Sequence, residues 1–392
     1  MATGRAWVSA SPLEVRALKA VRSAVPATVL ALGVFTAVRG AGVLVLGLGA
    51  WWAGRDPIQV LGGSWDSGWY LGIAGHGYGR TLMWPGTGSV QSDYAFFPLY
   101  PVLIRAVSAV LPGGLMAAGL FVAWAAAAVA ALGVYRVGER LAGARAGLLL
   151  VALWAALPHA VVLTMAYTES LLAALAAWAL YALLRGRWLW AAGLAVLAGL
   201  TRPTGLAVAA AVCAVALHAV VVRGSRSPAV WTAGLLAPAG WAAYVLAVGM
   251  RVDDPLGGYF TVQRRWGSRF DFGVGALRSA ERVLTGGHVP LATTVTVVLL
   301  AAAGLLAVLL VLDRTPPALL AYTGVLLLIT FGGAGFFESK PRFLLPAFPL
   351  LLPVAAAMAR ARLRTSVVVT AGLAGLSCGY GLYLLLVARV PL

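Results

Sequence analysis

The acidic residue with the most distinctive surroundings is Asp66, which stands in the run WDSGWYLGIAGHGYG. Trp65, Trp69 and Tyr70 surround it, and such aromatic residues concentrate where a membrane meets water. A carboxyl group held there is partly shielded from water, which raises its pKa and suits it to remove a proton as a general base. The alternative is that Asp66 caps a short helix in an aromatic-rich loop. The sequence therefore offers Asp66 as a base or as a cap.

The same run continues to His76, which stands between two glycines. His76, Trp65, Trp69 and Tyr70 could together line a substrate pocket, although a single histidine between glycines is more often a loop residue. No second histidine or cysteine lies near His76, and a zinc site needs several such ligands. We therefore expect no metal here.

Two clusters of basic residues lie beside apolar runs and could bind an anion. Arg202 stands in the turn TRP between two such runs, and Lys340 and Arg342 stand in SKPRF at the start of another. Arginine suits phosphate oxygens, and free N–H groups at a helix N-terminus favour the same ligand. The alternatives are an arginine that reaches from a helix end to water and a pair of cations that anchors lipid headgroups.

The segment YTES holds the remaining candidates, Tyr167 and Glu169. Thr168 or Ser170 could cap the helix that follows, and the positive end of the helix dipole would stabilise Glu169. These local roles account for most of the segment, while a place for Tyr167 and Glu169 in the substrate pocket stays open.

The composition around these residues is that of a membrane protein. Of the 392 residues, 61% are hydrophobic and 10% are charged, whereas a soluble domain carries about 25% charged residues. The formal charge of +17 comes mainly from arginines in the gaps between apolar runs, as expected for basic cytoplasmic loops. No basic segment is interleaved with aromatic residues, so nucleic acid is not expected as a partner.

The apolar runs predict an all-α bundle that crosses the membrane about eleven times, because a spanning helix takes about 20 apolar residues. The run Phe96–Leu111 is short and holds prolines and an arginine, which favours an interfacial helix. No linker divides the chain, which predicts one domain, 1–392, with outer loops at 51–113 and 251–289. The expected spans are Pro26–Ala50, Leu115–Tyr135, Ala146–Leu163, Ser170–Leu184, Trp188–Leu200, Pro203–Val222, Val230–Met250, Pro290–Leu312, Pro316–Phe331, Phe343–Ala359 and Ser366–Val387.

The arginines also predict the orientation. With the N-terminal segment 1–25 in the cytoplasm, every gap that falls inside carries arginine, as 136–145 does. Both long loops and all the polar clusters above then fall on the outer face. Arg264, Arg265 and Arg269 in the second long loop mildly oppose this assignment, but long loops follow the charge rule less strictly. We therefore expect a multi-pass protein of the cell membrane with its polar clusters extracytoplasmic.

Taken in order, the motifs resemble those of a known family. The runs WDSGWYLGIAGHGYG, FFPLYPVLIR, YTESLLAALA, GLTRPTGL and SKPRFLLPAFPL are similar to segments of the PIG-V-type mannosyltransferases, which belong to the GT-C superfamily of membrane glycosyltransferases. The ordered set covers nearly the whole chain, although no single motif is specific. The resemblance implies a GT-C-type bundle with a carboxylate base in the first outer loop, at the position of Asp66.

The resemblance further implies that mannose moves from a polyprenyl-phosphate or dolichyl-phosphate carrier with inversion at the anomeric carbon. Asp66 would take the proton of the acceptor hydroxyl, and Arg202, Lys340 and Arg342 would stabilise the departing phosphate. Beside this lipid-linked donor, no cofactor or metal would be required. The acceptor, whether a glycan, a lipid or a protein, stays open. Another lipid-linked sugar, and a transporter or lipid flippase, remain alternative functions.

Overall fold

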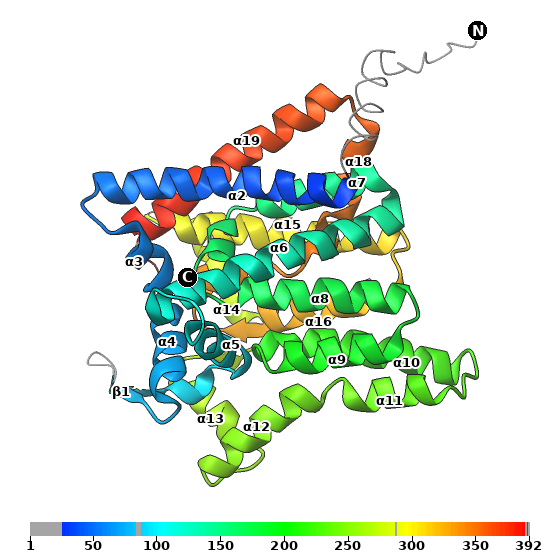
Figure 1. The fold of residues 1–392 in the computed structure, drawn as a ribbon, viewed down its shortest axis with the longest axis horizontal. Coiled ribbons are helices and arrows are strands. Elements are labelled where there is room, and N and C mark those ends of the chain that lie inside the picture. Colours follow the sequence, from blue (N-terminus) through cyan, green and yellow to red (C-terminus); the bar gives the residue numbers. More distant parts are fainter. Residues whose placement is uncertain (1–25, 84–87, 287, 389, 391–392) are drawn as a thin grey trace.

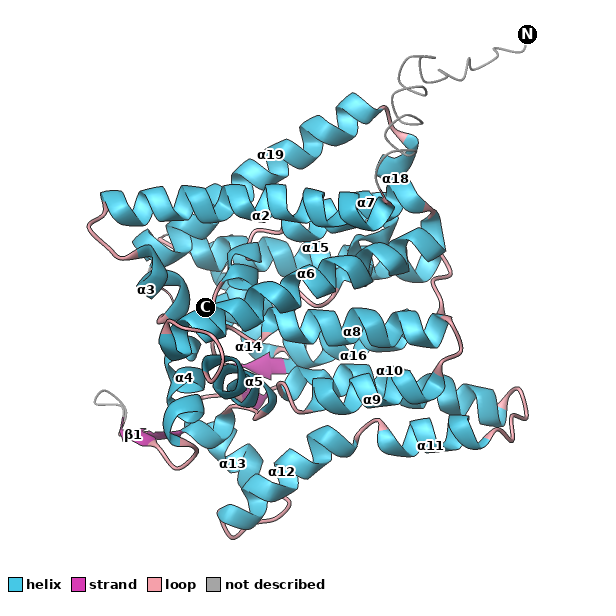
Figure 2. Ribbon diagram, viewed as in Figure 1, coloured by secondary structure: helices cyan, strands magenta, loops and turns pink. Residues whose placement is uncertain are grey.

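The computed structural model describes residues 26–83, 88–286, 288–388 and 390. Long helices run side by side across the molecule, and short helices gather at one end (Figure 1, Figure 2). We call the end that carries α3 (Pro57–Gly62), α4 (Asp66–His76), α5 (Leu99–Ser108) and α13 (Gly258–Arg265) the loop end. The N-terminal segment 1–25, which was predicted to be cytoplasmic, lies outside the described residues.

Six helical segments of the described chain are long and apolar enough to cross a membrane. Each of them coincides with a predicted span, so the prediction of an all-α bundle of apolar helices is confirmed. The bounds are α2 (Ala27–Trp52), α6 (Gly114–Ala142), α10 (Leu206–Val221) after the 3-10 turn η3 (Pro203–Gly205), α11 and α12 (Pro228–Leu236 and Ala239–Arg251), α15 (Leu291–Leu312), and α19 (Leu363–Leu382) with a closing π turn (Tyr383–Ala388).

Shorter elements occupy the other predicted spans. One is a bent pair, in which Phe337–Phe343 and Phe348–Arg360 meet at 76°, and counting it as one span brings the long segments of the described chain to seven. The pair contains η4 (Phe337–Ser339), α17 (Lys340–Phe343), η5 (Phe348–Leu351) and α18 (Leu352–Arg360). The rest are α7 (Ala144–Ala155), α8 (Glu169–Leu184), α9 (Trp188–Gly199) and α16 (Pro317–Gly332).

Three predicted spans are broken rather than continuous, and the shortest break, at Ala237 and Pro238 in the range Val230–Met250, separates α11 from α12. In the range Ala146–Leu163, α7 ends at Ala155 and a 3-10 turn, η2 (Ala160–Thr164), follows. Pro158 stands in the gap, and proline cannot donate the hydrogen bond that would continue the helix. In the range Phe343–Ala359, Pro346 stands in the bend between α17 and η5. A proline therefore stands at each of the three breaks.

Short elements of both long loops cover the loop end. The first loop forms α3 (Pro57–Gly62), α4 (Asp66–His76), the 3-10 turn η1 (Asp93–Ala95) and the predicted interfacial helix α5 (Leu99–Ser108), which has 10 residues and is too short to span. The second loop forms α13 (Gly258–Arg265) and α14 (Val274–Thr285). Two small antiparallel pairs were not predicted: β1 (Thr81–Met83) with β2 (Val90–Ser92), and β3 (Arg269–Phe270) with β4 (Gly333–Ala334).

Close contacts between small residues bring α6 and α7 together. A Cβ atom on Gly138 would lie 2.8 Å from the Cα atom of Gly147, and one on Gly147 would lie 2.8 Å from the carbonyl oxygen of Tyr135. Glycines of this kind let helices in membranes approach closely. The start of the broken segment is therefore fixed against a long helix.

The end of α7 is held by two hydrogen bonds from buried side chains. Nη1 of Arg39, on α2, donates to the Ala155 carbonyl oxygen at 3.3 Å, and a cation at a helix C-terminus is favourable. Nε1 of Trp154 donates to the Leu345 carbonyl oxygen at 2.8 Å. The break after α7 is thus tied both to α2 and to the bent pair, and the chain continues from it into the site described next.

Candidate active site

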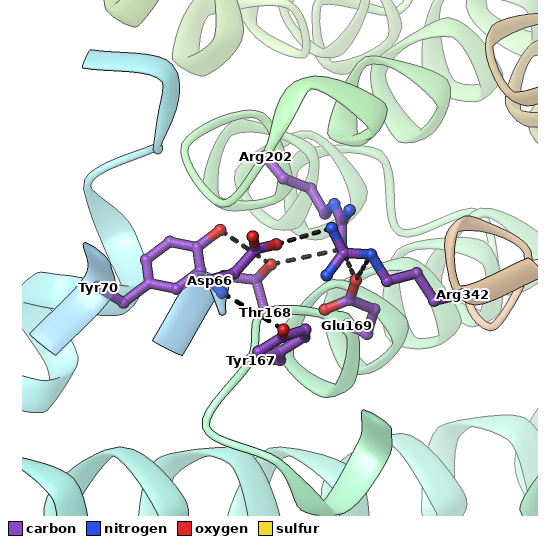
Figure 3. A network of polar contacts seen from close by, with 7 residues as sticks. All are labelled: Asp66, Tyr70, Tyr167, Thr168, Glu169, Arg202 and Arg342. Carbon is purple, nitrogen blue, oxygen red and sulfur yellow. Dashed lines mark hydrogen bonds and ion pairs between the residues drawn. The ribbon is translucent and has the colours of Figure 1, made fainter. Parts of the chain in front are cut away.

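Two carboxylates and two guanidinium groups meet where α4, α8 and the link after α9 approach α17 (Figure 3). Arg342 contacts both acids: its Nη2 lies 2.7 Å from Asp66 Oδ2, and its Nε lies 3.6 Å from Glu169 Oε1. Nη1 of Arg202 lies 2.5 Å from the same Glu169 oxygen. When all four groups are ionised, their charges cancel. Each of the four segments singled out from the sequence therefore supplies one charged group to a single network.

The four side chains differ in exposure. Glu169 retains 1% of its side-chain surface, Arg202 10% and Arg342 8%, whereas Asp66 retains 26%. Buried charges persist in proteins when they are paired, as these are. Asp66 is the member that remains accessible to an incoming molecule.

The start of α4 positions Asp66. Asp66 is the first helical residue, and Trp65 occupies the cap position with a φ of 44°, a left-handed conformation that is unusual for a bulky residue. The backbone N–H of Asp66 donates to the hydroxyl of Tyr167 at 3.3 Å. The alternative that Asp66 caps the helix is therefore wrong: its carboxylate pairs with Arg342 instead.

The start of α8 positions Glu169 and links it to α4. Thr168 precedes α8 but makes no side-chain cap, contrary to one expectation; its hydroxyl accepts from Arg202 Nη1 at 3.4 Å and lies 3.3 Å from the hydroxyl of Tyr70. Ser170 donates to the Leu163 carbonyl oxygen at 2.9 Å rather than capping the helix. Thr168 thus connects α4 with Arg202, a role that the sequence did not indicate because Thr168 already fitted a local cap.

The guanidinium of Arg342 keeps unused hydrogen-bond donors. Its Cζ lies 5.1 Å from the ring centres of both Tyr167 and Phe343, a placement that favours a cation. Within the part of the chain that the structure describes, Nε and Nη1 of Arg342 and Nε of Arg202 are buried and have no hydrogen-bond partner. Buried unpaired donors are costly, so these groups are suited to an anion that brings its own acceptors.

Lys340 lies apart from this network. Its Nζ donates to the backbone carbonyl oxygens of Thr330 at 2.9 Å, Phe331 at 3.2 Å and Gly333 at 2.6 Å. Thr330 and Phe331 belong to the last turn of α16, where the helical carbonyls lack partners of their own, and Gly333 follows the helix directly. The structure therefore joins Lys340 to α16, not to Asp66.

The aromatic residues and His76 are distributed over α4. Trp69 stacks on Phe96 with ring centres 5.7 Å apart and meets Trp266 edge to face at 5.0 Å, so it belongs to the packing of the loop end. His76 is exposed at the far end of α4, about 15 Å along the helix from Asp66 at 1.5 Å per residue. Of the predicted pocket residues, Trp65, Tyr70 and Tyr167 adjoin the network, and Trp69 and His76 do not contact it.

The surroundings of Asp66 change its acidity. Burial raises the pKa of the Asp66 carboxyl above its ordinary value, the Arg342 charge opposes this rise, and the Glu169 charge adds to it. A carboxylate with a raised pKa binds a proton more readily than an exposed aspartate does. This property suits a general base.

A metal site needs several ligand side chains close together. In residues 26–83, 88–286, 288–388 and 390, no group of three or more His, Cys, Asp or Glu side chains is placed to hold a metal ion. The expectation that no metal takes part stays a prediction.

Comparisons with known proteins give one structural likeness. No protein-family model matches the chain, and no curated protein sequence matches it. Among solved structures, the chain is similar to the crystal structure of the Archaeoglobus fulgidus oligosaccharyltransferase in complex with Zn and sulfate, with a TM-score of 0.48 and 15% sequence identity. The match covers 90% of this chain and 53% of that chain, so the protein spans about half the length of its structural neighbour.

Proposed function

We propose that this protein is a membrane glycosyltransferase, which moves a sugar from a lipid-phosphate carrier to an acceptor hydroxyl. The observation that supports this proposal is the pairing of one accessible carboxylate, Asp66, with buried guanidinium groups that have unused donors. A base beside an anion site is what the displacement of a phosphate from a sugar carbon requires.

The reaction would proceed in one displacement. The acceptor oxygen attacks C1 of the sugar from the face opposite the phosphate, and its proton passes to Asp66. The bond between C1 and the phosphate oxygen breaks with its electron pair on that oxygen, so the sugar leaves the carrier with inverted configuration. The phosphate departs as an anion and needs no proton from the protein.

The two arginines would stabilise the charge that grows on the phosphate. Arg342 Nη1 and Arg202 Nε, which have no hydrogen-bond partner among the described residues, can donate to its oxygens. Electrostatic stabilisation of this kind is often the largest contribution to catalysis. Glu169 would hold both guanidinium groups in place, since it pairs with each of them. Lys340 was predicted to bind the phosphate together with the two arginines. Because its Nζ instead donates to carbonyl oxygens at the end of α16, we propose that Lys340 fixes the position of the segment that carries Arg342.

The pairing between Asp66 and Arg342 implies an order in which the two substrates bind. At 2.7 Å, Arg342 Nη2 neutralises the carboxylate while the site holds no donor. A phosphate that takes up the donors of Arg342 competes with Asp66 for this guanidinium and releases the carboxylate towards the acceptor. The lipid-linked donor should therefore bind before the acceptor.

The substrates follow from the motif resemblance given above. We propose polyprenyl-phosphate mannose as the donor, a GT-C-type arrangement of the bundle and an extracytoplasmic site, with the acceptor left open. The purified protein, reconstituted in liposomes, should transfer radiolabelled mannose from this donor to a component of a membrane extract. Donors that carry glucose or arabinose test the sugar in parallel. No transfer from any lipid-phosphate sugar would exclude the proposal, whereas transfer of a different sugar would correct only the donor.

A further inference from the structure

Helix α14 in the second long loop exposes apolar and basic residues on adjoining faces. Leu277 and Leu284 retain 72% and 83% of their surface, and residues seven apart lie on the same face of a helix. Arg278 and Arg282, four residues apart, are exposed on the neighbouring face. Just before the helix, Phe272 retains 87% of its surface. Exposed leucine and phenylalanine on a short helix indicate a surface that contacts another phase or molecule.

The segment is strongly basic. Residues 264–282 contain five arginines and two acids. One acid, Asp271, accepts hydrogen bonds from the backbone N–H groups of Gly273 at 2.9 Å and Gly275 at 2.8 Å. Its carboxylate therefore satisfies N–H groups at the N-terminus of α14. The ion pairs found among the described residues include none of these arginines. The arginines are therefore available to an external anion.

Chain connections keep α14 close to the membrane surface at the loop end. The helix ends at Thr285, and the long apolar helix α15 begins at Leu291, so the link spans at most about 20 Å at 3.3–3.6 Å per residue. On the other side, β3 pairs with β4, which follows α16 directly, and the N–H of Asp271 donates to the Gly332 carbonyl oxygen at 2.8 Å. Helix α14 also contacts α15 and α16, near the end of α16 from which β4 continues.

We propose that α14 lies on the lipid leaflet at the loop end, with Leu277 and Leu284 at the boundary of the acyl chains and its arginines on anionic headgroups. Short amphipathic helices with this division of residues bind in the plane of a membrane interface, and anionic lipids strengthen the binding. An acidic polymer would use the arginines but would leave the exposed leucines and Phe272 in water, whereas a lipid surface would contact both groups of residues. The assignment goes beyond the proposed sugar transfer and does not depend on it.

Fluorescent labels on α14 test the proposal in the full-length protein. A single cysteine is introduced as Leu277→Cys or Leu284→Cys after Cys213→Ala and Cys378→Ala, and it carries an environment-sensitive label. The matched control is His76→Cys, which labels an exposed position on α4 of the same loop end. The protein is reconstituted in nanodiscs of phosphatidylcholine, with or without phosphatidylglycerol, and quenched with brominated lipid. Thermal unfolding verifies that each variant is folded.

The expected result is emission at shorter wavelength and stronger quenching at both leucine positions than at His76, with a further increase when phosphatidylglycerol is present. Arg278→Gln combined with Arg282→Gln should remove that increase, as should ionic strength of about 1 M, where the Debye length falls to about 3 Å. Equal quenching at all three positions would overturn the proposal. So would a label that responds to a soluble polyanion or to protein concentration but not to lipid, because these responses would indicate an acidic polymer or a second copy.

Discussion

Asp66 supplies the sharpest test at the scale of single residues. Because the proposed base must accept the proton of the acceptor, Asp66→Asn should reduce transfer by about 10²- to 10⁴-fold, the usual contribution of a general base. The initial rate of sugar transfer with the reconstituted protein measures this loss. Asp313→Asn, at an exposed aspartate after α15, is the control and should keep full activity. An active Asp66→Asn protein would exclude Asp66 as the base.

The neighbours of Asp66 should shift the pH dependence in opposite directions. Since the base works only when ionised, activity rises with pH through the pKa of Asp66, which burial raises, Arg342 lowers and Glu169 raises. Arg342→Gln removes the lowering charge and should move the acid limb of kcat/KM to higher pH. Glu169→Gln removes a raising charge and should move it to lower pH. Shifts of the same sign in both variants would contradict the assignment of this limb to Asp66.

The sequence singled out three of the four charged residues of the network as candidate catalytic or phosphate-binding groups and gave the fourth, Glu169, mainly a local role. Asp66, Arg202 and Arg342 stood out because charged groups beside apolar runs need partners. Glu169 fitted the dipole at the start of α8, a local reason that concealed its contacts with both arginines. Lys340 was grouped with Arg342 because they are two residues apart, yet on α17 their side chains point to different partners. Partners distant in sequence are not encoded in such local patterns.

At the scale of elements, Lys340 is expected to secure the end of α16. Its Nζ donates to three backbone carbonyl oxygens, and each hydrogen bond to a charged group contributes about 1.5–3 kcal/mol. Lys340→Met should therefore lower the thermal unfolding temperature and leave the KM for the donor nearly unchanged. Arg342→Gln should instead mainly change kcat and KM. A Lys340→Met protein of unchanged stability and strongly raised donor KM would instead place Lys340 in the phosphate site.

The contact between α6 and α7 gives a second prediction for an element. A methyl group on Gly147 would lie 2.8 Å from the Tyr135 carbonyl oxygen and 2.9 Å from the Glu139 nitrogen, both of them backbone atoms. Gly147→Ala should thus cost about 1–3 kcal/mol by overpacking, seen as a lower unfolding temperature in detergent. Gly193→Ala, on α9, is the matched control, because nothing lies within 4 Å of the added carbon. This variant should be at least as stable as the unchanged protein. Equal losses in the two variants would contradict close packing as the cause, because helix propensity favours alanine over glycine at both positions.

Apolar periodicity predicted where helices would form but not how they would break. Every predicted span contains a helix, because long apolar runs favour a helix in a membrane whatever their neighbours are. The breaks at Pro158 and Pro346 depend on contacts such as that of Trp154 with Leu345, which lie far apart in sequence. The pair β3 and β4 joins segments of only two residues each, too short to produce a strand pattern.

At the scale of the whole molecule, the arrangement of the helices predicts a topology. Arg140 lies near the end of α6, and Arg265 ends α13 at the loop end (Figure 1). Reporter fusions at these two positions should therefore report opposite faces of the membrane, with Arg140 in the cytoplasm. Reports from one face only would separate Asp66 from the side of the membrane that the proposed reaction requires.

The neutral charge balance of the network also bears on turnover. In the proposed reaction, the carrier bound beforehand is a phosphodiester with one negative charge, whereas the carrier left behind is a monoester with a charge of about −1.5 to −2 at neutral pH. Arg202 and Arg342, buried and short of acceptors, should hold this spent carrier more firmly than the substrate. The enzyme should therefore be inhibited by its own lipid product, and the rate at which the emptied carrier escapes into the bilayer should limit the steady state.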